Sequence, residues 1–100
     1  MNYTLLIRPV VHAELEEIQD WYEQKQRGLG DRIEDQFKET LDRIRKQPLR
    51  PPFVRGKTRR IEMKSFPYAV FYVVINDIIH VLSILHKRRS PDRWPRSNPN

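Results

Sequence analysis

The sequence has 100 residues, of which 38% are hydrophobic and 32% are charged, and its formal net charge is +6. A chain of this length forms one compact domain with one core, so a two-domain enzyme is excluded and we expect a single domain over residues 1–100. The absence of cysteine excludes a disulfide framework, a thiolate metal site and a cysteine nucleophile.

The N-terminal half predicts one strand followed by two helices. Residues 2–8 are rich in β-forming side chains and end at Pro9, which is typical of a first strand. Apolar residues then recur with the helical period over residues 11–22 and again over residues 31–46. The intervening residues 28–30, Gly-Leu-Gly, predict a turn, so the two helices form an antiparallel hairpin.

The next segments predict an irregular connection and then a strand. Residues 47–57 contain three prolines and a glycine, which favours a crossover without regular structure. Residues 59–64 alternate between apolar and charged positions with the period of a strand. This alternation places Arg59 at the border of the buried face and points Arg60 and Glu62 toward solvent.

Two further strands complete the predicted sheet. The apolar run 69–75 is typical of a central strand that is covered on both faces, and Asn76-Asp77 predicts a tight turn into a last strand over residues 78–85. We expect the tail from about residue 95 to be flexible. The fold class is therefore α+β: an N-terminal strand at a sheet edge, a two-helix antiparallel hairpin and a three-stranded antiparallel meander.

The sequence gives little support for a metal site, a catalytic serine or a phosphate-binding loop. His12 lies on a predicted helix, and His80 and His86 lie six positions apart on one strand, roughly 20 Å, so they cannot share one ion. The sequence has no Gly-x-Ser-x-Gly turn, and the glycines at residues 28–30 lack the Lys-Ser/Thr of a phosphate-binding loop. We expect no metal and no cofactor.

The charge is divided between two parts of the chain. Residues 14–44 carry ten acidic and five basic side chains, whereas the rest of the chain carries three acidic and fourteen basic ones. The positive excess is concentrated in residues 50–64 and 87–96. Such a distribution is typical of a surface that binds a polyanion, and a solvated basic face is the alternative interpretation.

The basic side chains come from two predicted strands. Arg59 and Arg60 on one strand and residues 87–89 after another are placed to gather on one sheet face, near His86 and Trp94. Guanidinium groups bind phosphate oxygens bidentately, and an indole ring stacks on a base or packs on a protein. If the site cleaved RNA, His86 would be the obvious titrating group. A basic rim that docks on an acidic protein explains the same residues.

Three C-terminal segments, in this order, resemble one known family. They are Arg59-Arg60-Ile61-Glu62-Met63, then Phe66-Pro67-Tyr68-Ala69-Val70-Phe71-Tyr72, then residues 81–91 with Trp94 after them. With the helical residues 13–18 and 28–48 they are similar to the RelE/ParE superfamily of toxins from bacterial type II toxin–antitoxin systems. The resemblance implies a helical hairpin packed on an antiparallel sheet, and a cognate antitoxin that wraps around the toxin and neutralises it.

The superfamily contains two activities. RelE-like members cut mRNA in the ribosomal A site with basic residues on the sheet and a tyrosine near the C-terminus. Arg60 and Arg88 keep the charge of two of these positions, but the other three fall at Glu62, Ala69 and Trp94. Groups that act as a unit lose most of their activity when several are missing, so the resemblance favours the ParE branch, whose similar members poison DNA gyrase.

We therefore expect a ParE-like, non-enzymatic toxin that inhibits gyrase. The target-binding residues would be Arg59, Arg60, Lys87, Arg88, Arg89 and Trp94. The alternatives are a metal-independent ribonuclease acting on ribosome-bound mRNA, with His86, Arg88 and Arg60 as catalytic candidates, and a basic nucleic-acid-binding module without toxicity. No apolar run approaches the roughly 20 residues of a membrane span, and no export signal is visible, so we expect a cytoplasmic protein with no membrane partner.

Overall fold

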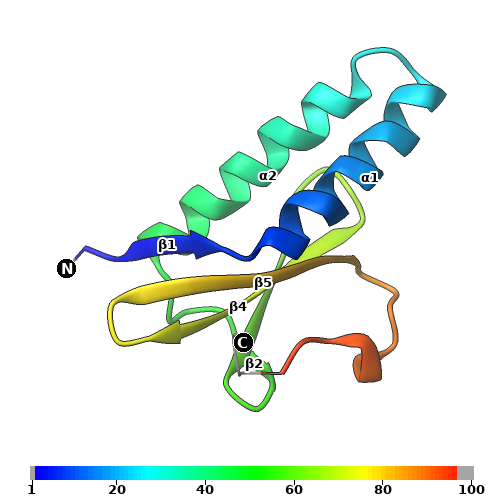
Figure 1. Ribbon diagram of the computed structural model, residues 1–100. Coiled ribbons are helices and arrows are strands. Elements are labelled where there is room, and N and C mark those ends of the chain that lie inside the picture. The colour runs from blue at the N-terminus through cyan, green and yellow to red at the C-terminus, as the bar shows by residue number, and fades with distance from the viewer. Residues whose placement is uncertain (1, 97–100) are drawn as a thin grey trace.

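In the computed structural model, which describes residues 2–96, two helices cover one face of a five-stranded sheet (Figure 1). The strand order is β1-β5-β4-β3-β2, with β1 parallel to β5 and the other neighbours antiparallel. The elements are β1 Thr4–Ile7, α1 Pro9–Lys25, α2 Leu29–Lys46, β2 Phe53–Arg55, β3 Thr58–Glu62, β4 Tyr68–Ile75, β5 Ile78–His86 and the 3-10 helix η1 Pro91–Arg93.

The helical hairpin forms where the sequence predicts it. Pro9 ends the strand and also opens α1, a position where its missing N–H costs no hydrogen bond. Gly28 has a φ of 92°, a left-handed conformation that favours glycine, and so makes the turn between the helices. The Glu23 carboxylate accepts the N–H groups of Gly28 at 3.0 Å and Gly30 at 2.9 Å, which fixes this turn.

The main core lies between the helices and the sheet. It is built from buried side chains of both helices and the central strands, namely Val11, Leu15, Ile33, Phe37, Ile44, Val70, Tyr72, Ile79, Val81 and Ile84. The Tyr72 hydroxyl donates a hydrogen bond of 2.7 Å to the carbonyl of Pro48, so the core also holds the segment that follows α2. None of the helices in the described part is long and apolar enough to cross a membrane.

The central strand β4 is buried on both faces, as its apolar run predicts. Val70 and Tyr72 face the helices, whereas Ala69, Phe71 and Val73 face the other side, and all five are at most 2% exposed. A strand with two buried faces reads as a continuous apolar run rather than an alternating one. The opposite face of the sheet therefore needs a cover of its own.

Two features of the sheet differ from the sequence prediction. Residues 53–55 form strand β2 instead of part of an irregular crossover, because the turn at Gly56, with φ of 58°, lets this segment pair with β3. The meander therefore has four strands, and the first strand joins it in parallel. Of the tail predicted to be flexible from about residue 95, residues 97–100 lie outside the described part.

Glu14 of α1 accepts hydrogen bonds from the part of the β5 edge that lies beyond the end of β1. The last hydrogen bond between this segment and β5 joins the Arg8 N–H to the Val81 carbonyl, at 3.0 Å. Farther along β5, the Glu14 carboxylate accepts the N–H of Ile84 at 3.0 Å and the Ser83 hydroxyl at 2.8 Å. These bonds satisfy groups at the edge of β5 that β1 does not reach. Burial raises the pKa of Glu14, and its two hydrogen bonds lower it only in part.

The substitution Glu14→Gln tests how the Glu14 carboxylate contributes to stability. A raised folded-state pKa means that the folded protein holds the proton more tightly than the unfolded chain, so the contribution of Glu14 to stability is lost as the pH rises above about 4.5. The free energy of unfolding is measured in urea for the variant Glu14→Gln and for the unchanged protein, at about pH 4 and about pH 7. We expect the variant to be more stable relative to the unchanged protein at about pH 7 than at about pH 4. A difference that is equal at both pH values contradicts this role.

Candidate functional site

The chain after β5 folds back across the sheet face that the helices leave free (Figure 1). We call residues 87–96 the C-terminal segment. One guanidinium nitrogen of Arg55, in β2, donates to the carbonyls of Pro91 at 3.4 Å, Asp92 at 3.2 Å and Trp94 at 2.8 Å. Pro91 and Asp92 belong to the short helix η1 and Trp94 is its C-cap residue, and a cation is favourable where such carbonyl oxygens converge. Arg55 therefore ties the C-terminal segment to the edge of the sheet.

Arg60 lies beneath this segment, beside two aromatic rings that also contact each other. Its guanidinium carbon is 5.2 Å from the ring centre of Trp94 and 5.8 Å from that of Phe71. It donates hydrogen bonds to the carbonyl of Lys87 at 3.2 Å and to the Glu62 carboxylate at 3.4 Å. The Arg60 side chain is only 17% exposed, so the prediction that it points freely into solvent is wrong, because the C-terminal segment covers it.

Arg59 lies on the opposite face of the sheet from Arg60. Its guanidinium donates to the carbonyls of Leu49 at 2.8 Å and Pro51 at 2.6 Å and stacks 4.1 Å from the centre of the Phe53 ring. Adjacent residues of a strand point to opposite faces. Arg59 is thus separated from Arg60 and holds the connection between α2 and β2.

His86, at the end of β5, faces the helices. It is the cross-strand partner of Tyr68, and the two rings meet edge to face at 5.3 Å. Tyr68 in turn contacts Tyr22 of α1. The Nδ1 atom of His86 accepts the backbone N–H of Arg88 at 3.1 Å. Burial and the neighbouring Tyr22 raise the pKa of Tyr68 to about 12, so Tyr68 is neutral at physiological pH.

The three cationic residues after β5 form an exposed turn. Lys87, Arg88 and Arg89 are all exposed, whereas their backbone is fixed. The Lys87 N–H donates to the Pro67 carbonyl at 2.9 Å, and the Arg89 carbonyl accepts the indole N–H of Trp94 at 3.3 Å. We call residues 87–89 the basic turn. The fold therefore presents three exposed cations on a hydrogen-bonded backbone.

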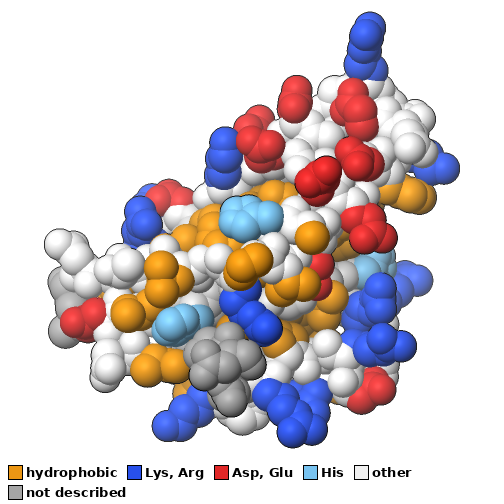
Figure 2. All heavy atoms as spheres, viewed as in Figure 1, with side chains coloured by type: hydrophobic (Ala, Val, Ile, Leu, Met, Phe, Trp, Pro, Cys, Tyr) orange, Lys and Arg blue, Asp and Glu red, His pale blue; other side chains and the backbone are white. Residues whose placement is uncertain are grey.

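The wider charge distribution follows the division in the sequence. Figure 2 shows acidic side chains gathered over the helices and Lys and Arg side chains gathered around the sheet and its lower edge. Within the described residues, no group of three or more His, Cys, Asp or Glu side chains is arranged to hold a metal ion.

The structure brings some of the predicted site residues together and separates others. Arg60, Trp94 and the basic turn are linked by direct hydrogen bonds and ring contacts. Arg59 lies on the other face, and His86 lies on the helix side. The ribonuclease candidates Arg60 and His86 therefore project from opposite faces of the sheet.

Two residues that organise this site were missed at the sequence level. Arg55 lies in a segment that was expected to be irregular, and Phe71 lies inside an apolar run that identifies a core strand but no particular partner. The Gly56 turn signal next to Arg55 would have indicated a hairpin. No local signal connects Arg55 to carbonyls more than thirty residues later in the chain.

The substitution Arg55→Gln tests whether Arg55 holds the C-terminal segment on the sheet. We expect Arg55→Gln to lower the free energy of unfolding by about 1–2 kcal/mol, because hydrogen bonds from a charged donor are lost. In a Trp21→Phe background Trp94 is the remaining tryptophan, and its fluorescence should shift to longer wavelength and become easier to quench. Arg50→Gln, which removes one exposed hydrogen bond to Gln47, is the matched control. Unchanged Trp94 emission in Arg55→Gln would contradict the attachment.

Comparison with known proteins identifies the family. The family described as "ParE toxin of type II toxin-antitoxin system, parDE" matches residues 5–91. A structure of the chromosomal ParDE toxin–antitoxin system of P. aeruginosa has a similar fold, with a TM-score of 0.76 and 16% identity over 84% of this chain and 95% of that chain. A mutant of the E. coli toxin RelE in the free state has a TM-score of 0.65 and 19% identity over 88% of this chain and 86% of that one. No curated protein matches significantly. The chain thus belongs to the ParE toxin family of type II toxin–antitoxin systems.

Proposed function

We propose that this toxin inhibits growth in the cytoplasm by binding DNA gyrase, without cleaving RNA, and that a cognate antitoxin neutralises it. One observation favours gyrase binding over RNA cleavage. His86 and Arg60 lie on opposite faces of the sheet, and Arg60 is engaged by Lys87 and Glu62. A metal-independent ribonuclease needs a base, an acid and phosphate-binding cations around one reacting phosphate.

The basic turn supports a binding role. Lys87, Arg88 and Arg89 are exposed and carry three positive charges on a fixed backbone. Positive charges on a rigid support attract an anionic or acidic macromolecule and accelerate its association. Trp94, half-buried beside the turn, adds an aromatic surface of the kind found at the centre of protein interfaces.

A pair of assays separates the two activities. The purified chain is added to DNA gyrase with relaxed plasmid, and in parallel to ribosomes translating a defined mRNA. We expect loss of supercoiling and intact mRNA. Cut transcripts, with cutting abolished by His86→Ala or Arg88→Ala, would instead support the ribonuclease alternative and contradict the proposal.

The basic turn can be tested in the same gyrase assay. Removing two exposed cations with Arg88→Ala plus Arg89→Ala should raise the half-inhibitory concentration about tenfold or more, because each charge contributes to association and binding. The control, Lys38→Ala plus Lys46→Ala, removes two exposed cations from α2, which pair with Glu34 and Asp42 in the same helix. Equal effects of the two pairs would show that net charge, not the turn, matters.

A further inference from the structure

The two edges of the sheet are protected to very different degrees. Strand β2 has three residues, follows Pro51 and Pro52, has an irregular register and ends on a charged residue. Short length, proline, irregularity and charge are the devices that prevent another strand from pairing with an edge. Strand β1 at the other edge, Thr-Leu-Leu-Ile, has no proline and no charge. It is open to strand addition.

The outer edge of β1 presents a regular pattern of free backbone groups. The N–H of Thr4 donates to Asp77 at 2.9 Å and the N–H of Arg8 donates to Val81 at 3.0 Å, so even-numbered residues pair with β5. Alternate residues of a strand direct their backbone groups to opposite sides. The N–H and C=O groups of Leu5 and Ile7 therefore point outward, where the sheet order has no neighbouring strand.

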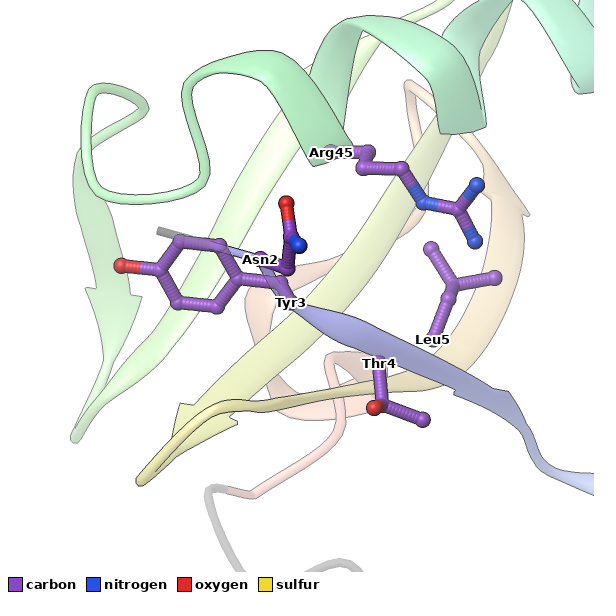
Figure 3. Close-up of a pocket in the computed structure, with 5 residues that line it drawn as sticks. All are labelled: Asn2, Tyr3, Thr4, Leu5 and Arg45. Atoms are coloured by element: carbon purple, nitrogen blue, oxygen red, sulfur yellow. The ribbon is translucent and has the colours of Figure 1, made fainter.

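An open depression of about 490 Å³ lies along this edge, lined by residues 2–5 and Arg45 (Figure 3). Arg45 comes from the last turn of α2, and Figure 3 shows its side chain extending toward Leu5. Two other cations of that turn, Arg43 and Lys46, form ion pairs within the helix. Arg45 is exposed and forms no ion pair or hydrogen bond with any described residue. A cation beside a free strand edge suits an acidic side chain.

We propose that the outer edge of β1 binds an extended, acidic segment of the antitoxin as a sixth strand, with a carboxylate of that segment paired to Arg45. The inference rests on the proposed function, which supplies an antitoxin as the partner. Leu5 and Ile7 pack on the core, so the 49% exposed Leu6 faces the other side of the sheet. The added strand accordingly carries acidic residues toward Arg45 and apolar residues toward Leu6, in alternation.

The charges favour this occupant over a second copy of the chain. Each copy has a net charge of +6 and carries Arg45 at this edge. Two copies paired through β1 would bring like charges together, which is destabilising, whereas an acidic segment is attracted.

Hydrogen exchange measured by NMR reads the pairing directly. The probe is the protein encoded by the gene next to the toxin gene, added to the labelled toxin. In the free toxin the Leu5 and Ile7 amides should exchange fast and the Leu6 amide slowly. In the complex, the Leu5 and Ile7 amides should slow about tenfold or more, because new strand hydrogen bonds protect them. The amides of β2 should not change.

Two single-charge variants test the ion pair in the same complex. Arg45→Gln should raise the Kd about tenfold by removing a charge-assisted hydrogen bond, whereas Lys46→Gln, the same charge change in the same helical turn, should raise it less than about twofold. Both variants keep the β1 backbone intact, so loss of folding does not obscure the comparison.

The outcomes separate the two proposals. Tight binding without protection of Leu5 and Ile7 would overturn the strand addition and leave the antitoxin partner in place. No binding by the neighbouring gene product would overturn the partner and, with it, this use of the edge. Slow exchange of both amides in a free toxin of dimeric mass would assign the edge to a second copy and contradict the proposal.

Discussion

Burial of β4 on both faces is the constraint on which the rest of the structure depends. Because side chains alternate along a strand, Val70 and Tyr72 can be covered by the helices, but Phe71 and Val73 cannot. An uncovered sheet face would leave a large apolar patch in water. The C-terminal segment resolves this at one end, where Trp94 packs on Phe71 with ring centres 5.7 Å apart.

The C-terminal segment that covers the sheet also determines where Arg60 and the basic turn lie. Arg60 completes the contact between Trp94 and the sheet and holds the Lys87 carbonyl, so the basic turn begins at a fixed point. Arg60 is therefore largely committed to the structure, whereas the side chains of residues 87–89 are exposed. The exposed cations of the basic turn are the part of this arrangement on which the proposed action on gyrase rests.

The sequence predicts the parts of the fold that rest on local patterns. The helical hairpin and the twice-buried central strand follow from periodicity and turn residues, the edge position of the first strand follows from the order of the elements, and the family follows from ordered motifs. Strand β2 was missed because three residues among prolines carry no periodic signal. The environments of Arg59 and Arg60 were missed for another reason. Leu49 lies ten residues from Arg59 and Trp94 lies 34 residues from Arg60, and only the tertiary fold brings these pairs together.

The contact between Arg60 and Trp94 carries the central claim, that the C-terminal segment is an integral cover of the sheet. A double-mutant cycle with Arg60→Met and Trp94→Leu, measured by urea unfolding, tests it most directly. We predict a favourable coupling energy of about 0.5–2 kcal/mol between the two side chains, the range for a cation over an indole ring. Additive effects, with no coupling between the two positions, would contradict the account.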